Sequence, residues 1–271
     1  ISLGAAGALT FAVAAAHAQS GDLAKREQTP GAVIEINAKA LAAPNATPSR
    51  ANASNTVDRG ASLPTVPGGF RVNVFAEGLD HARNMIVLEN GDVLLAEQRP
   101  GKVTLLRDAN GDGVAEMKQT FAEGFNIVYG LAQGKDALYV GDAQGIWRIA
   151  YTAGDAKARA PQQRISADGA FGGGGGHVTR NLALSSDGTT IYVAVGSRGN
   201  IAEEEEQRAT IQEFTLEGGK AVKQRTFASG LRNAVGTAFF PGTSTLYTVV
   251  NERDGLGDEL VPDYLTLSLI H

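Results

Sequence analysis

A histidine placed directly after five consecutive glycines is the first candidate for chemistry in the sequence. His177 follows Gly172–Gly176, and Arg180 lies three residues further on. Glycine loses more backbone entropy on folding than any other residue, so a glycine run is expected where the chain must approach another group closely. An imidazole with an ordinary pKa suits the role of general base. A flexible loop that carries an incidental histidine explains the same spacing equally well.

Two further polar side chains stand next to each other at Arg232 and Asn233, directly before a run of β-type residues. A guanidinium offers a fork of donors to carboxylate or quinone oxygens, and a carboxamide can pair with a ring carbonyl. We therefore expect this pair to bind a cofactor. The alternative is an arginine with a structural role, which pairs across neighbouring segments.

A glycine-rich acidic loop at 251–259 is a candidate calcium site. Gly255, Asp258 and Glu259 are the residues that we expect to supply its ligands. Ca²⁺ prefers oxygen ligands, and carboxylates on a flexible loop supply them. A solvated acidic turn is the alternative.

A second acidic segment, 108–113, matches the opening of an EF-hand loop. Position twelve of that loop would be Gln119 in place of the usual glutamate, so a tight hairpin turn between two strands is the favoured interpretation. The run of four glutamates at 203–206 is interpreted as a solvated loop.

The end of the strand expected at 93–97 carries Glu97 and Gln98, followed by Lys102. Binding residues are frequently found on loops at the ends of a rigid scaffold. We therefore take Glu97 and Gln98 as candidate substrate contacts, with a surface turn as the alternative.

Composition limits the classes of protein that can carry these groups. The 271-residue chain has a formal charge of −5 at pH 7 and no cysteine. The charge and the lack of a basic block argue against nucleic acid as a partner. The lack of cysteine excludes disulfides, thiolate nucleophiles and cysteine-bound zinc or iron–sulfur sites. The content of 43% hydrophobic residues, together with 34 glycines, favours a turn-rich all-β protein with a substantial core.

The strands that must position the candidate residues recur along the chain. Four β-branched and aromatic runs each follow a turn with glycine or aspartate, at 93–97, 137–141, 190–195 and 245–250. The string Phe-Ala-Glu-Gly at 75–78 recurs at 121–124, and Phe-Ala-Ser-Gly follows at 227–230. Units of about 46 to 55 residues with four strands each are typical of β-propeller blades.

The repeat divides the chain into three parts. Residues 1–18 have the apolar, alanine-rich character of an export signal, 19–63 have the composition of a flexible linker, and 64–271 hold about four blades. We expect no stable membrane insertion after the signal is cleaved. A propeller must close or its end blades expose strand edges, so 64–271 is either a four-bladed ring or part of a larger propeller. We expect a truncated larger propeller, because the sequence stops in an apolar run at 265–270 without the pattern of a closing strand.

Three segments in this order, 176–183, 230–236 and 251–258, resemble the sorbosone dehydrogenase family, a branch of the soluble glucose and aldose sugar dehydrogenases that depend on pyrroloquinoline quinone (PQQ). The resemblance covers about 64–271. It implies a six-bladed propeller, of which this chain would hold about four blades and would by itself be inactive. It also implies an exported, periplasmic enzyme that oxidises a small sugar or aldehyde, with PQQ and Ca²⁺ as cofactors and an external electron acceptor.

The resemblance also assigns roles to the candidate residues. His177 corresponds to the base that takes the substrate hydroxyl proton, Arg232 and Asn233 to contacts of the quinone oxygens, with Arg180 beside them, and the loop with Gly255 to the calcium site. One departure concerns Ser197, which stands where glucose dehydrogenases place an aspartate that orients the base. A metal-dependent lactonase on a similar propeller and a propeller that only binds partners remain the alternatives. A large separation of His177 and Arg232 on opposite faces would favour the latter.

Overall fold

The computed structural model describes residues 37–49, 56–204, 206–257 and 260–267. By internal contacts the chain divides into two units, Ile1–Leu41 and Ala42–His271. The described part of the first unit contains a single 3₁₀ turn, Ala38–Ala40, capped by the Asn37 side chain, which accepts a hydrogen bond of 3.0 Å from the Lys39 amide. The expected export signal at 1–18 lies outside the described residues. Of the expected linker, 37–49 and 56–63 are described, and they contain no strand.

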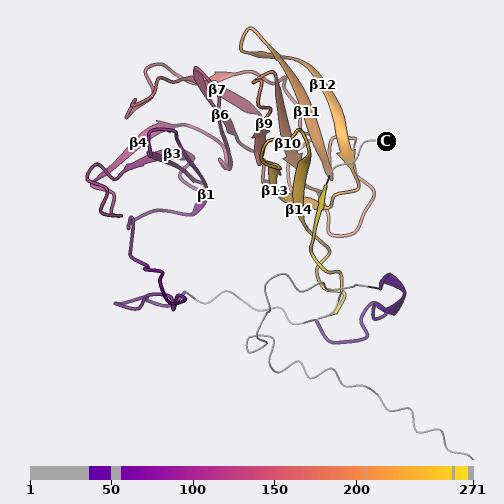
Figure 1. Ribbon diagram of the computed structural model, residues 1–271. Helices are drawn as coiled ribbons and strands as arrows, with labels where there is room; N and C mark the ends of the chain where they lie inside the picture. Colours follow the sequence, from indigo (N-terminus) through magenta and orange to yellow (C-terminus); the bar gives the residue numbers. More distant parts are fainter. Residues whose placement is uncertain (1–36, 50–55, 205, 258–259, 268–271) are drawn as a thin grey trace, which may run out of the picture. The chain divides into compact units, whose positions relative to one another are not determined.

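The second unit contains four antiparallel sheets in chain order (Figure 1). The first consists of β1 (Ala82–Val87), β2 (Val93–Glu97), β3 (Lys102–Arg107) and β4 (Met117–Glu123). The second consists of β5 (Gly130–Gln133), β6 (Ala137–Gly141), β7 (Ile146–Ala150) and β8 (Gln163–Arg164). The third consists of β9 (Leu182–Leu184), β10 (Thr190–Val195), β11 (Thr210–Glu217) and β12 (Lys220–Ser229), and the fourth of β13 (Asn233–Phe239), β14 (Leu246–Asn251) and β15 (Tyr264–Leu267).

Each sheet is a meander in which consecutive strands pair, because short turns with glycine or aspartate connect them. Gly91, at a φ of 86°, closes the turn between β1 and β2, and Gly188, at 72°, closes the turn between β9 and β10. Positive φ values of this kind are readily adopted by glycine and seldom by other residues. Between β1 and β2, Val87 pairs with Val93 and Ile86 pairs with Leu94.

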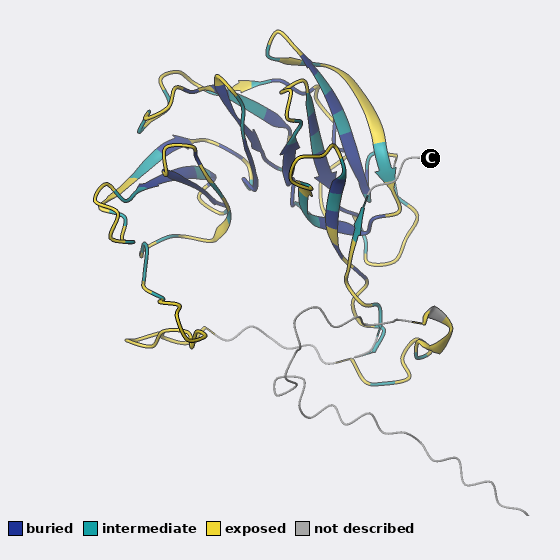
Figure 2. Ribbon diagram, viewed as in Figure 1, coloured by how far each residue is buried: buried dark blue, intermediate teal, exposed yellow. Residues whose placement is uncertain are grey.

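The core lies between successive sheets and not within one of them. Leu94 and Leu105 of the first sheet pack with Leu138 of the second. Tyr139 of the second sheet packs with Phe214 of the third, and a further cluster joins the third sheet to the fourth. Buried residues accordingly line the middle strands in Figure 2, and every residue of β2 and of β6 is buried. Sheets covered on both faces are typical of propeller blades, and their middle strands are apolar throughout.

The first strands β1, β5, β9 and β13 are neighbours in that order, as the inner strands of successive propeller blades are. The chain is therefore all-β, with four blades of a β-propeller, as the repeat predicts. The first strand of each blade begins beside the end of its second strand, as Ala82 pairs with Glu97 and Asn233 with Asn251. We call this end of the blades, formed by the loops before the first strands and after the second strands, the site end.

Candidate functional site

The candidate residues gather at the site end of neighbouring blades. Adjacent blades touch there: the amide of Phe125 bonds to the carbonyl of Gly101 at 3.0 Å, and the amide of Ser197 to the carbonyl of Arg232 at 2.6 Å. The second contact brings the chain around His177 next to Arg232. The separation on opposite faces that would favour a propeller without catalysis is therefore not found.

His177 is fixed by the chain segment that follows β10. Its backbone amide donates to the carbonyl of Ser197 at 3.0 Å. Its ring atom Nδ1 lies 2.9 Å from the same carbonyl and 3.1 Å from the Ser197 hydroxyl. The hydroxyl in turn donates to the carbonyl of Gly199 at 2.7 Å. The ring is half-buried, and no described residue forms a hydrogen bond with its Nε2 atom.

The glycines around His177 are required by close packing. A Cβ atom added to Gly176 would lie 2.6 Å from the Ser197 carbonyl oxygen, and one added to Gly196 would lie 2.7 Å from the Cβ atom of His177. Gly176 also has a φ of 66°, which side chains with a Cβ rarely adopt. The close approach expected of the glycine run is thus made to the 196–198 segment of the same blade. Gly174 differs, because no atom lies within 4 Å of its added Cβ.

Arg180 lies beneath the loop that carries His177. It is 2% exposed, its guanidinium stacks 5.3 Å from the centre of the Phe171 ring, and Nη1 donates to the carbonyls of His177 at 2.9 Å and Thr179 at 2.7 Å. Burial and, to a smaller extent, the nearby positive charge of Arg208 lower the pKa of Arg180 to about 10. In this position Arg180 supports the loop, and it is not open to a ligand.

Asn233, the second residue of the expected cofactor-binding pair, keeps a donor available. It is buried, and its Oδ1 atom accepts a hydrogen bond of 3.1 Å from the Thr179 hydroxyl. A Cβ atom on Gly196 would come within 2.5 Å of that Oδ1, so the carboxamide lies against the same segment as His177. The hydrogen bonds of the described residues use Oδ1 alone and leave the Nδ2 donor available to a carbonyl oxygen.

Arg232 uses its guanidinium within the protein. It donates to the carbonyls of Asn200, Asn251 and Glu252, to the Asn200 side chain at 2.7 Å and to the Asp254 carboxylate at 2.8 Å. The arginine side chain is 5% exposed, while that of Asp254 is 86% exposed. Arg232 therefore ties the loop after β10 to the loop after β14. A ligand anion would compete with the exposed Asp254 carboxylate for this guanidinium.

The acidic loop that begins after β14 is described in part. Gly255 is exposed and has a φ of 76°, which fits a turn. Asp258 and Glu259 lie outside the described residues. The calcium site predicted there stays a prediction.

Glu97 is buried within the first blade and is not part of a surface turn. Its side chain accepts hydrogen bonds from the Thr104 hydroxyl and, at 2.5 Å, from the Asp80 amide, and Lys102 lies 3.3 Å away. Burial raises the pKa of Glu97, but the hydrogen bonds from Thr104, Asp80 and Lys102 together outweigh it and hold this pKa below its usual value. Gln98 is half-buried, and its amide donates to the His81 carbonyl at 3.0 Å, while no described residue bonds to its side chain. Of the two expected substrate contacts, Gln98 is the one with a free side chain.

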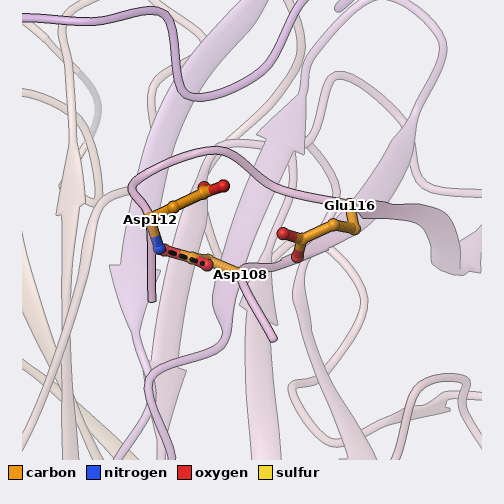
Figure 3. Close-up of side chains that lie close together, drawn as sticks. All are labelled: Asp108, Asp112 and Glu116. Atoms are coloured by element: carbon orange, nitrogen blue, oxygen red, sulfur yellow. Dashed lines mark hydrogen bonds between the residues drawn. The ribbon is translucent and has the colours of Figure 1, made fainter. Parts of the chain in front are cut away.

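The segment 108–113 forms the hairpin turn between β3 and β4, as expected, at the opposite end of the blade from the site end. Figure 3 shows the carboxylates of Asp108, Asp112 and Glu116 on this turn, with their oxygens within 4.8 Å of one another. The amides of Gly113, Gly111 and Asp112 donate to Asp108 and hold its pKa below the usual value. Backbone hydrogen bonds to Asp108 thus account for the shape of this turn without an ion.

A cavity of about 490 Å³ opens beside Ser197, between the loop after β10 and the strands β11 and β12. Its walls include Asn200, Arg208, Arg232 and Arg253, together with Glu204 and Glu206. A lining of hydroxyl, carboxamide and guanidinium groups suits an oxygen-rich ligand.

Sequence reasoning missed several residues that shape the site. Glu204, expected only as part of a solvated run, accepts hydrogen bonds from the amides of Arg198 at 2.9 Å and Gly199 at 3.0 Å. The Tyr129 hydroxyl, at the start of the second blade, donates to the Val235 carbonyl in the fourth at 3.2 Å. No local sequence signal marks such contacts, because each partner lies in another loop or blade.

Comparison with known families places residues 64–262 in the family described as TrAA12-like. This range begins at the predicted start of the propeller and contains every described candidate residue. The match is to this family and not specifically to sorbosone dehydrogenases.

Solved structures share the fold at low sequence identity. A calcium structure of a Trichoderma reesei protein of carbohydrate-active enzymes family AA12 has a TM-score of 0.65 and 20% identity, covering 79% of this chain and 58% of that one. The holo form of the PQQ domain of pyranose dehydrogenase from Coprinopsis cinerea has a TM-score of 0.59 and 23% identity, covering 72% of this chain and 50% of that one. The chain thus spans about half of the one and somewhat more than half of the other.

A curated relative is an uncharacterised protein of Borreliella burgdorferi, 32% identical over 91 residues, which are 34% of this chain and 23% of the relative. Among the described residues, no helix is long and apolar enough to cross a membrane.

Proposed function

The chain belongs to the TrAA12-like family, and on that basis we propose that it is part of a PQQ-dependent oxidoreductase that oxidises a small sugar or sugar aldehyde. The observation that carries the proposal is the arrangement of His177, whose Nδ1 is held by Ser197 while Nε2 has no partner among the described residues. Asn233 lies against the same segment with a free amide donor. The PQQ domain named in a structural neighbour supports the choice of cofactor.

The residues present fit an oxygen-rich quinone in part. The Nδ2 donor of Asn233 suits a quinone carbonyl oxygen. Arg232 already binds a carboxylate oxygen, that of the exposed Asp254, which is the kind of group that it would have to accept from a carboxylated cofactor. Arg180 does not fit, because its guanidinium is buried under the loop and bonded to backbone carbonyls. We therefore assign the cofactor contacts to Asn233 and Arg232.

Bound PQQ supplies the hydride acceptor, a function for which no side chain is suited. The protein's own residues move the proton and orient the reacting groups. His177 accepts the hydroxyl proton of the substrate at Nε2. This makes it easier for the carbon that bears this hydroxyl to lose a hydride. Donors such as Asn233 and Arg232 favour negative charge on oxygens near them.

The finer parts of the proposal follow from the sequence resemblance. They are a sorbosone or aldose substrate, a Ca²⁺ ion held near Gly255, an external electron acceptor, and a periplasmic location after export. The calcium-containing AA12 structure supports the choice of ion.

The proposal is tested by turnover of the full-length protein after reconstitution with PQQ and Ca²⁺. Glucose, sorbosone and simple aldehydes are offered with an artificial electron acceptor, and each is repeated without the quinone. We expect oxidation of at least one sugar or sugar aldehyde that depends on PQQ. Oxidation of none of them contradicts the proposal, and hydrolysis of a lactone without quinone would favour the lactonase alternative.

A further inference from the structure

We propose that the Ser197 hydroxyl is a positioning residue that holds His177 in the tautomer with its proton on Nδ1. This inference deepens the proposed function, because that tautomer leaves Nε2 free to accept a proton.

Each partner of Nδ1 is an acceptor. The Ser197 carbonyl, 2.9 Å from Nδ1, can only accept. The Ser197 hydroxyl, 3.1 Å from Nδ1, has its own proton directed to the carbonyl of Gly199 at 2.7 Å. Because its single proton is used there, the hydroxyl faces Nδ1 with a lone pair. Both contacts therefore require a proton on Nδ1, and in a neutral ring Nε2 is then the unprotonated atom.

The serine is itself held in place. It is 3% exposed, and its amide donates to the Arg232 carbonyl at 2.6 Å. The carbonyl of Gly199 accepts the hydrogen bond from the Ser197 hydroxyl. Gly199 is itself fixed, because its amide donates a hydrogen bond of 3.0 Å to the Glu204 carboxylate. Rigid partners of this kind set the orientation of an imidazole as well as its tautomer.

The charged groups around the His177 ring do not fix its tautomer or its orientation. Arg180 donates to the His177 carbonyl at 2.9 Å, and Arg208 donates to the Gly175 carbonyl at 2.5 Å and lies 3.4 Å from the Ser197 carbonyl. Glu204 faces the amides of Arg198 and Gly199. The described residues place no carboxylate on Nδ1, so the neutral hydroxyl and carbonyl take the position that an aspartate would otherwise occupy.

The first test measures the tautomer directly in the cofactor-free protein. Nitrogen-15 chemical shifts of the histidine rings are recorded in the full-length protein at a pH where the rings are neutral, and the His177 signals are assigned by their loss in His177→Gln. We expect Nδ1 to carry the proton in the wild type. A proton on Nε2 would overturn the inference without any serine variant.

The second test compares Ser197→Ala with Ser197→Thr, which keeps the hydroxyl. We expect the alanine variant to lose part of the Nδ1-protonated population and about three- to tenfold in kcat, with little change in KM, and the threonine variant to restore both. An alanine variant with the wild-type tautomer population would overturn the inference. If that variant does not fold, the wild-type tautomer decides alone.

Ser185→Ala is the matched control. Ser185 lies at the other end of the same blade, and its hydroxyl donates to Asp187 at 2.6 Å. Its loss removes a comparable hydrogen bond and should leave the His177 signals and kcat unchanged. The tautomer is measured without the quinone, so its result stands even if no sugar is oxidised. Conversely, PQQ-dependent turnover with the proton on Nε2 would uphold the proposed function and overturn this inference.

Discussion

Arg232 and Asp254 form an ion pair of 2.8 Å in which the guanidinium is buried and the carboxylate is almost fully exposed. The arginine holds its place through the backbone carbonyls of Asn200, Asn251 and Glu252 as well, so it does not depend on the carboxylate for its position. Asp254 is thus an exposed partner of this guanidinium, for which a ligand anion would compete. The pair joins the loop before β13 to the loop after β14 at the site end.

Removal of the Asp254 charge should strengthen cofactor binding. In Asp254→Asn the carboxylate no longer competes for Arg232 or repels an anionic quinone, and we expect the Kd for PQQ to fall by about two- to fivefold at low salt. Titration of the cofactor-free protein measures the change. Asp168→Asn, which removes the exposed partner of Arg164 in the second blade, serves as the control and should leave the Kd unchanged. Weaker binding in Asp254→Asn would show that the carboxylate organises the site and does not compete with the ligand.

A single methyl group at Gly196 should disturb the base and the amide donor together. The added Cβ atom would lie 2.5 Å from Oδ1 of Asn233 and 2.7 Å from Cβ of His177. We expect Gly196→Ala to lower the free energy of unfolding by about 1–3 kcal/mol and to reduce kcat. Denaturant unfolding and steady-state kinetics measure the two effects.

Gly174→Ala is the control for that variant, because no atom lies within 4 Å of its added Cβ. Its free energy of unfolding should change by less than about 1 kcal/mol. Equal losses in the two variants would mean that the glycine run as a whole, and not the close contact at Gly196, sustains the site.

Glu97→Gln should affect stability in a pH-dependent way. The folded protein holds the pKa of Glu97 below its ordinary value of 4.5, so ionised Glu97 stabilises the fold above that pH, and the contribution is lost as the pH falls through the folded-state pKa. We expect the variant to be less stable than the wild type by about 1–3 kcal/mol at pH 7, with the difference shrinking below pH 4.5. Glu77→Gln, at an exposed pair with Arg59, should show no such difference. A gap between wild type and Glu97→Gln that stays constant across this range would contradict the account.

Gln98→Ala separates substrate contact from structure in the first blade. The Gln98 side chain has no hydrogen-bond partner among the described residues, so its loss should leave thermal stability unchanged. If the side chain contacts the sugar, KM should rise by about two- to tenfold. An unchanged KM would remove Gln98 from the site.

The sequence allowed the blades to be predicted well, because their middle strands are buried on both faces. The runs expected at 93–97, 137–141 and 190–195 coincide with β2, β6 and β10, and the fourth, at 245–250, is offset by one residue from β14. Continuous runs of β-branched and aromatic residues between glycine turns are a local signal, and these runs form strands in the structure. First strands such as β9, which has three residues, carry a weaker signal, and the sequence pattern did not predict their bounds.

The candidate site was predictable in location but only partly in contacts. His177 and Asn233 both lie against the 196–198 segment at the site end, and their roles stay predictions. The role of Arg180 under the loop depends on Phe171 and on backbone carbonyls, and neither contact can be read from spacing. Ser197 was noted for lacking a carboxylate, yet its hydroxyl and carbonyl both reach Nδ1. Local sequence cannot show which loop a carbonyl will face.

The most direct test of the account follows the absorbance of PQQ bound to the full-length protein while a sugar is added to the wild type and to His177→Ala. Both proteins should bind the quinone, because His177 is assigned to the proton and not to cofactor affinity. The sugar should reduce the cofactor in the wild type, and the rate in His177→Ala should be about 10²–10⁴-fold lower. Failure of the wild type to bind the quinone, or reduction at the wild-type rate in the variant, would contradict the account.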